Sequence, residues 1–180
     1  MDMYFIAILA PREINEKVTQ WKKWMKEHFG CEAALRSPAH VTLIPPFWME
    51  PSFEEPLITA LNQFALNCRP FELEINDFSS FRPRVIFLEV IRSEELLSIK
   101  EALVRNLEES RSFPFPLEER PFHPHITIAT RDLHKKVFQD AWEYFQNKKY
   151  QAAWTVNDIS LLRHNKKNWD VLHTSQFKNI

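Results

Sequence analysis

The sequence is nearly without glycine, and this scarcity excludes several common nucleotide-binding and catalytic loops. Gly30 is the single glycine among 180 residues. Neither the G-x-G-x-x-G turn of dinucleotide-binding folds nor the G-x-x-x-x-G-K-[ST] loop of P-loop proteins can be written, and the G-x-S-x-G elbow of serine hydrolases is missing too. Any chemistry on a nucleotide or an ester must therefore use side chains that are not presented by a glycine loop.

Cysteines and long apolar runs are also scarce. Cys31 and Cys68 are the two cysteines and form no C-x-x-C pair, so we expect buried thiols in a reducing compartment rather than a disulfide or a zinc site. No stretch approaches the roughly 18 apolar residues of a membrane span. The apolar residues 1–9 lack the basic segment that opens a signal peptide. We therefore expect a cytoplasmic protein that does not engage a membrane.

The chain carries no excess of charge of either sign. It has 23 basic and 24 acidic residues and a formal net charge of −1. Proteins that grip long duplexes through many phosphates usually have a basic excess, so we expect any nucleic-acid contact to be local, at an end or on a small fragment. With 44% hydrophobic residues, residues 1–180 suit one domain, or two small lobes that share a core. We expect a monomer that needs no obligate protein partner.

Apolar spacing predicts helices mixed with strands. Helical spacing marks residues 13–29, 57–64, 93–107 and 137–145. Strand patterns mark residues 4–9, 41–44, 71–75, 85–90, 125–129, 159–162 and 171–177, and a loop is predicted at 113–124. We expect the first helix to end near Gly30, Pro45-Pro46 to stop the strand at 41–44, and 71–75 to pair with 85–90 as a hairpin. Hairpins between the helices favour an α+β fold with largely antiparallel sheets.

Two of the predicted strands begin with the same pattern, His40-Val41-Thr42 and His125-Ile126-Thr127. Residues i and i+2 of a strand point to the same face. Each strand therefore presents one imidazole and one hydroxyl, while the apolar residues between them turn into the core. If the two strands face each other, one small cleft holds two imidazoles and two hydroxyls.

That set of groups suits attack at a phosphodiester. A neutral imidazole can take a proton from the attacking water or hydroxyl, and a protonated imidazole can give one to the departing oxygen. The threonine hydroxyls can hold the non-bridging oxygens as charge develops in the transition state. The chemistry requires neither a metal nor another cofactor.

The histidines also have structural and metal-binding interpretations. A pair of half-exposed structural histidines is the plain alternative, and His173-Thr174-Ser175 shows that the pattern also arises elsewhere; we interpret His173 as a solvated or packing residue because no apolar run follows it. His123 and His125 form a His-x-His pair that can chelate a metal. Pro124 between them and the lack of a nearby carboxylate disfavour this, and the shared β-branched context of the two motifs favours catalysis.

The sequence resembles the two-histidine phosphoesterase superfamily, in the branch related to the 2′-5′ RNA ligases and RNA cyclic phosphodiesterases. Besides the motifs, the similar segments are 4–11, Pro70-Phe71-Glu72-Leu73 leading to Phe81, 120–129, and Leu161-Leu162 followed by Trp169 and Phe177. The resemblance spans nearly the whole chain. It implies one bilobal α+β domain of two ferredoxin-like lobes related by a pseudo-twofold axis, each lobe carrying one motif that faces a central cleft.

The resemblance also implies an activity. Such proteins act without a metal on 2′,3′-cyclic phosphate or 2′-5′ phosphodiester linkages at RNA or nucleotide ends. By analogy His40 is the proton donor and His125 the acceptor, and the roles exchange when the reaction runs backwards. Two alternatives are a 2′-5′ RNA ligase that uses the same cleft and a non-catalytic module that binds RNA ends or nucleotides.

Further residues become candidates for substrate binding through this resemblance. Phe5, Phe47 and Phe81 are candidate cleft-lining aromatics on which a base can stack, and we expect one of the three to do so. An arginine often follows the second motif in such proteins; here Arg131 is the candidate phosphate ligand.

Overall fold

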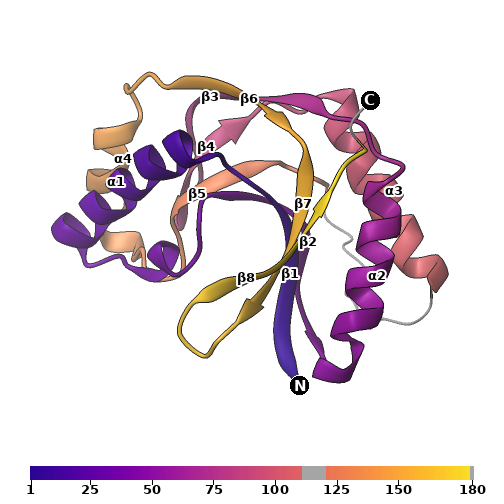
Figure 1. Cartoon of the computed structure of the whole chain (residues 1–180). Helices are drawn as coiled ribbons and strands as arrows, with labels where there is room; N and C mark the ends of the chain where they lie inside the picture. Colours follow the sequence, from indigo (N-terminus) through magenta and orange to yellow (C-terminus); the bar gives the residue numbers. More distant parts are fainter. Residues whose placement is uncertain (111–120, 179–180) are drawn as a thin grey trace.

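The computed structural model describes residues 1–110 and 121–178, which form two four-stranded antiparallel sheets and flanking helices (Figure 1). The predicted α+β class with largely antiparallel sheets is confirmed. Most of the predicted loop 113–124 lies outside the described residues. The helices are α1 (Arg12–Phe29), α2 (Glu54–Ala65), α3 (Glu94–Ser110) and α4 (Lys135–Phe145). The strands are β1 (Asp2–Leu9), β2 (His40–Met49), β3 (Phe71–Phe81), β4 (Val85–Val90), β5 (His125–Ala129), β6 (Gln151–Val156), β7 (Asp158–His164) and β8 (Trp169–Gln176).

The two sheets share a strand arrangement. Their orders are β2-β1-β7-β8 and β5-β4-β3-β6. In each sheet a strand, a helix and an antiparallel edge strand follow one another, as β1-α1-β2 in the first and β4-α3-β5 in the second. His40 opens β2 and His125 opens β5. The edge strand of each sheet therefore carries one motif.

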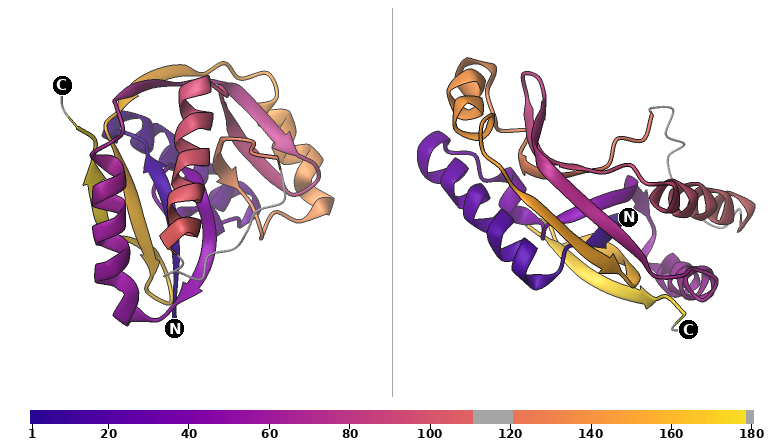
Figure 2. Two further views of the ribbon diagram at one scale, coloured as in Figure 1. Left: turned by 90° about the vertical axis from the view of Figure 1, so that its right-hand side faces the viewer. Right: turned by 90° about the horizontal axis from the view of Figure 1, so that it is seen from above.

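The helices lie in two pairs on opposite sides of the molecule, α1 with α4 and α2 with α3 (Figures 1 and 2). Trp24 of α1 stacks on Tyr144 of α4, with ring centroids 3.6 Å apart, and Trp21 packs edge-on against Phe78 of β3. Helix α1, which follows a strand of the first sheet, thus packs on the second, while α3 contacts β2 of the first. This exchange of helices joins the two halves through one core.

Helix α1 ends where its sequence predicts. Val18 and Met25 of its apolar face are fully buried. Gly30 has φ 69°, a left-handed conformation that glycine adopts without steric cost, and its N–H donates to the carbonyl of Lys26 at 2.9 Å. The chain then turns toward the short 3₁₀ helix η1 (Ala33–Arg36) that precedes β2.

The two cysteines are free and buried, as predicted. Burial raises the pKa of both the Cys31 and the Cys68 thiol to about 11, so both are neutral thiols near pH 7. Across residues 1–110 and 121–178, none of the helices has the length and apolar character needed to cross a membrane.

Strand β2 continues through the double proline, so the prediction that Pro45-Pro46 would stop it is wrong. β2 lies at the edge of its sheet. Its pairing with β1 shifts register between the Ile6–Ile44 pair and the Tyr4–Phe47 pair, and the two prolines fall in this irregularity. Proline has no N–H to donate to a ladder and is tolerated at edges and bulges.

Strand β6 has no counterpart among the predicted strands. Its sequence, Gln151–Val156, includes two adjacent alanines and shows no strong alternation of apolar and polar residues. In the structure its residues are exposed or half-buried, except for Val156. It is the edge strand beside β3, with which it pairs from Phe71–Val156 to Asn76–Gln151. Pairing with a neighbouring strand, rather than local preference, accounts for this strand.

Candidate active site

The two motif strands lie in contact with each other and hold their motifs in the predicted orientation. The histidines and threonines of both motifs are partly exposed. The alternate positions of the same strands lie in the core and are at most 1% exposed: Val41, Leu43, Ile126 and Ile128.

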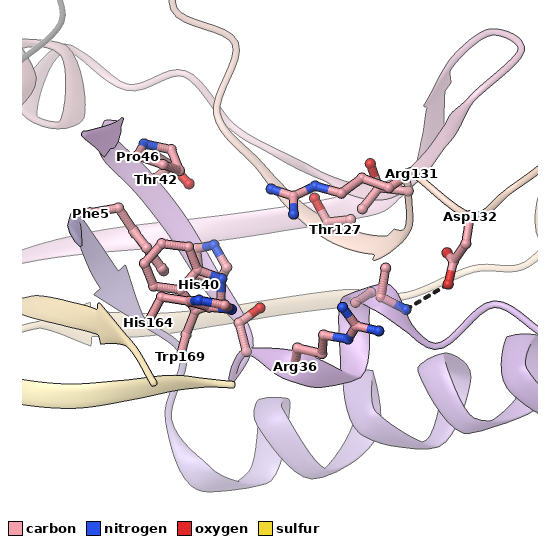
Figure 3. Close-up of a pocket in the computed structure, with 14 residues that line it drawn as sticks. Phe5, Arg36, His40, Thr42, Pro46, Thr127, Arg131, Asp132, His164 and Trp169 are labelled. Carbon is pink, nitrogen blue, oxygen red and sulfur yellow. Dashed lines mark hydrogen bonds between the residues drawn. The ribbon is translucent and has the colours of Figure 1, made fainter. Parts of the chain in front are cut away.

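The motif residues line two adjoining pockets. The first, here called the His40 pocket, has a volume of about 470 Å³, and its walls include His40, Thr42 and Thr127 (Figure 3). The second, called the His125 pocket, has about 530 Å³ and is lined by Thr42 and His125 among others. Thr42 and Pro46 belong to both linings. The fold therefore brings all four motif residues to one composite cleft.

The two imidazoles are fixed by the same local hydrogen bond. Nδ1 of His40 lies 2.7 Å from the carbonyl oxygen of Pro38, and Nδ1 of His125 lies 2.7 Å from that of His123. A carbonyl oxygen only accepts hydrogen bonds, so Nδ1–H is the donor in both rings. In the neutral ring Nε2 then carries the lone pair. Both histidines are thus oriented to exchange protons through Nε2.

Each histidine also packs against a phenylalanine that the sequence marked. The ring centroid of Phe5 lies 4.8 Å from that of His40, and Phe81 lies edge-on to His125 at 5.2 Å. Phe5 is 3% exposed and Phe81 is 39% exposed. Phe47 lies instead in the core, where its nearest aromatic partner is Tyr4 at 6.1 Å, and it lines neither pocket.

The surroundings of His40 favour its neutral form. Burial, with smaller electrostatic contributions from Lys22 and His125, lowers the pKa of His40 to about 4, and the Nδ1 bond to Pro38 opposes these effects. Lys22 of α1 is itself buried, which lowers its pKa to about 8, and its Nζ donates to the carbonyl of Ser37 at 3.0 Å. Near pH 7 the imidazole of His40 is therefore neutral.

Arg131 lies at the rim of the His40 pocket. Its backbone has φ 48°, a left-handed conformation that is uncommon outside glycine. Figure 3 shows its side chain crossing Thr127 toward the wall formed by Thr42 and Pro46. Its guanidinium group thus lies between Thr127 of the second motif and Thr42 of the first (Figure 3).

Several residues that line the His40 pocket were not predicted from the sequence, among them Arg36, His164 and Trp169. Trp169 packs edge-on against Phe5 at 4.6 Å, and His164 lies 4.9 Å from Trp169. His164 and Trp169 flank the turn between β7 and β8, which the sequence marks only as polar. Arg36 ends η1, four residues before the first motif. That proximity in sequence was the one available signal.

His123 and His173 have polar partners of their own. Nε2 of His123 lies 2.8 Å from Oε1 of Glu89, so the expectation that no carboxylate lies near His123 is wrong. Glu89 sits on β4 opposite His125, a pairing that only the sheet register reveals. Within the described residues, no three His, Cys, Asp or Glu side chains gather as metal ligands do. His173 bonds Asn62 of α2 at 2.8 Å and lines neither pocket, which fits its interpretation as a packing residue.

Comparison with known proteins extends over nearly the whole chain. A Bacillus pumilus (strain SAFR-032) protein named as a phosphoesterase is 30% identical over 177 residues, which cover 95% of each chain. The RNA 2′,3′-cyclic phosphodiesterase of Bacillus subtilis (strain 168) is 25% identical over 141 residues, covering 71% of this chain and 70% of that protein.

The fold is that of a solved structure, E. coli LigT complexed with 3′-AMP. This structure superimposes with a TM-score of 0.68 at 22% identity and covers 99% of both chains. The family model described as the 2′-5′ RNA ligase superfamily matches residues 10–168. The chain therefore belongs to the 2′-5′ RNA ligase superfamily, the two-histidine phosphoesterases that its paired motifs resemble.

Proposed function

We propose that this protein is a phosphodiesterase that opens a 2′,3′-cyclic phosphate at the end of an RNA or a nucleotide, using His40 and His125 and no metal. The observation that carries the proposal is the matched Nδ1 hydrogen bond of the two imidazoles, each 2.7 Å from the carbonyl oxygen two residues before it. Such a bond fixes the tautomer and orientation of a catalytic histidine before substrate arrives.

The reaction needs two proton transfers and one displacement at phosphorus. A water molecule attacks phosphorus while one neutral imidazole accepts its proton through Nε2. The bond from phosphorus to one ribose oxygen breaks, and the other imidazole, protonated, donates a proton to that oxygen. Thr42 and Thr127 donate hydrogen bonds to the non-bridging oxygens as their charge grows. The product is a single phosphomonoester, and no electrons are exchanged with a cofactor.

We assign the acceptor role to His40 and the donor role to His125. The lowered pKa of His40, which burial causes, supports this choice, because a histidine neutral near pH 7 can take a proton from water at once. The family resemblance implies the opposite assignment for the two positions. A substrate that needs no acid for its departure distinguishes the two assignments.

Three further side chains are proposed to bind the nucleotide. Phe5 and Phe81 lie beside the two histidines, and a base can stack on the exposed face of Phe81. Arg131 is proposed to hold an oxygen of a phosphate other than the reacting one, from the rim of the His40 pocket. Phe47 is left out of this proposal because it lies in the core.

The proposal is tested with purified protein and adenosine 2′,3′-cyclic phosphate in excess EDTA. We expect one monoester product, and we expect His40→Ala and His125→Ala each to lose turnover while keeping the circular-dichroism spectrum of the folded protein. His173→Ala is the matched control, because His173 lies outside both pockets. Turnover that persists in both motif variants would contradict the proposal.

The superfamily description and the B. subtilis relative suggest two nucleophiles that could open the same cyclic phosphate, the 5′-hydroxyl of another RNA end in ligation and water in hydrolysis. One labelled oligonucleotide with a cyclic phosphate end, incubated with and without an RNA that has a 5′-hydroxyl, separates them: a monoester end supports hydrolysis, and a 2′-5′ joined product supports ligation. Tight binding of nucleotide ends without turnover by either route would favour the non-catalytic module.

A further inference from the structure

Two arginines and one carboxylate, those of Arg36, Arg131 and Asp132, line the His40 pocket. We propose that Arg36 and Arg131 form a second-phosphate subsite in this pocket. On this view, which rests on the proposed function, the preferred substrate carries a phosphate on its 5′ side in addition to the cyclic one. In a nucleotide whose 2′ and 3′ oxygens are held in the cyclic phosphate, the 5′ oxygen is where the second phosphate attaches.

The two arginines approach the pocket from different elements. Arg36 ends η1, just before the first motif strand, and Arg131 follows the second motif strand β5. Both line the His40 pocket, and Figure 3 shows their side chains on opposite sides of it. A guanidinium group offers several N–H donors in a plane and matches phosphate oxygens in pairs. Two such groups around one space form a site for a phosphate away from the histidine pair.

The segments that carry these arginines are tied together by Asp132. Its Oδ2 accepts hydrogen bonds from the backbone N–H groups of Glu32 and Ala33, both at 2.8 Å. These bonds join the loop after β5 to the start of η1, so the positions of Arg131 and Arg36 are coupled. The other oxygen, Oδ1, is buried from solvent. The Asp132 carboxylate therefore holds the scaffold and places one negative charge in the wall of the pocket, against the two positive charges of Arg36 and Arg131.

Arg36 is only weakly engaged by an acidic neighbour. Its guanidinium lies 3.9 Å from Glu32, whereas the ammonium of Lys26 lies 3.0 Å from the other oxygen of the same carboxylate. The Arg36 side chain is 52% exposed, and surface ion pairs at this distance contribute little. A phosphate in the pocket can therefore recruit Arg36 at small cost.

Among residues 1–110 and 121–178, neither an arginine nor a lysine lines the His125 pocket. Apart from Thr42 and its two histidines, the described residues that line it are prolines and phenylalanines: Pro45, Pro46, Phe81, Pro121, Phe122 and Pro124. The His40 pocket, at about 470 Å³, is within the range of small-ligand sites. Within the described part of the chain Arg36 and Arg131 line the His40 pocket alone, so we place the 5′ phosphate of the nucleotide in that pocket, beyond His40.

The test compares two ligands that differ by one phosphate, adenosine 3′-monophosphate and adenosine 3′,5′-bisphosphate, by calorimetric titration. We expect the bisphosphate to bind about tenfold more tightly or better, because each arginine adds charge-assisted hydrogen bonds. We expect the double variant Arg36→Gln/Arg131→Gln to lose this advantage. Arg12→Gln is the matched control, because Arg12 is 90% exposed and pairs with Glu16 on α1.

Equal affinities for the two ligands in the unsubstituted protein, or an advantage that survives in the double variant, would overturn the subsite. A kinetic arm identifies the source of the phosphate: adenosine 2′,3′-cyclic phosphate is compared with its 5′-phosphorylated form and with a dinucleotide that ends in the cyclic phosphate. A higher kcat/KM for either of the last two, lost in the double variant, supports the subsite. If none of the three is turned over while the binding difference remains, the proposed reaction fails and the subsite stands.

Discussion

His40 and His125 share a local arrangement and differ in their surroundings. Each opens an edge strand, and each donates from Nδ1 to a carbonyl two residues earlier at 2.7 Å. His40 packs against the buried Phe5, and the buried Lys22 lowers its pKa, whereas His125 packs against the exposed Phe81. The short-range sequence thus sets the orientation of both rings in the same way. The tertiary environment then makes them chemically unequal, as an acid–base pair requires.

The largest effect is expected from removing either imidazole. His40→Ala and His125→Ala should each lower kcat for a cyclic phosphate about 10³-fold, because each removes one positioned proton-transfer group. Steady-state kinetics at pH 7 measures the loss. If one variant loses activity and the other keeps it, the two histidines are not partners in one reaction.

Changing the leaving group of the substrate tests whether the two histidines have different roles. On a nucleoside p-nitrophenyl phosphodiester, whose leaving group departs without a proton, the deficit of His125→Ala should shrink by about 10²-fold, the rate share of a general acid. The deficit of His40→Ala should stay, because the water still needs a base. Release of p-nitrophenolate is followed by absorbance. Recovery by His40→Ala in place of His125→Ala would reverse the assignment made here.

Substituting the motif threonines tests whether both motifs contribute to catalysis through a hydroxyl as well as through a histidine. Thr42→Val and Thr127→Val keep the β-branched shape and remove one hydroxyl donor each. We expect kcat to fall by about 10²-fold in either variant, as for loss of one donor to a developing oxyanion. Thr174→Val of β8 is the control, since Thr174 lines neither of the two pockets. Unchanged kcat in both motif variants would remove the threonines from the mechanism.

The smallest expected effect is on folding. The pKa of His40 falls from 6.5 to about 4 on folding, so as the pH drops below about 6.5 the unfolded chain takes up a proton that the folded chain does not. This group's contribution is complete above pH 6.5 and is lost as the pH falls toward 4. Over that pH range the free energy of unfolding should therefore fall by about 1–2 kcal/mol less in His40→Asn than in the unsubstituted protein. Urea unfolding at pH 7 and pH 4.5 measures the difference, and parallel losses would show that His40 titrates normally.

What the sequence predicted and what it missed follow from the range of the interactions. The helices, the hairpin from Phe71 to Val90 and the motif strands carry strong local patterns, and the structure confirms them. Pro45-Pro46 misled the prediction because proline is incompatible with a central strand and acceptable at an edge. Edge position is a property of the sheet, which no short segment encodes.

The candidate site divides in the same way. The four motif residues are recognisable because each histidine and threonine are two positions apart on one strand. Glu89 comes beside His123 through the sheet register, and His164 reaches the cleft through a turn, so no local pattern marks either residue. Phe47 was predicted to line the cleft on the same grounds as Phe5, but its side chain packs in the core. The sequence around a strand residue does not show which layer will pack on each face of the strand.

The central claim is that both imidazoles act on one phosphate, and nuclear magnetic resonance of the histidine rings tests it most directly. Adenosine 3′-monophosphate is titrated into protein with ¹⁵N-labelled histidine, and the Nε2 signals of His40, His125 and His173 are followed. We predict that the signals of His40 and His125 shift together with a single Kd while that of His173 stays. Shifts at only one of the two, or at both with different Kd values, would contradict the claim.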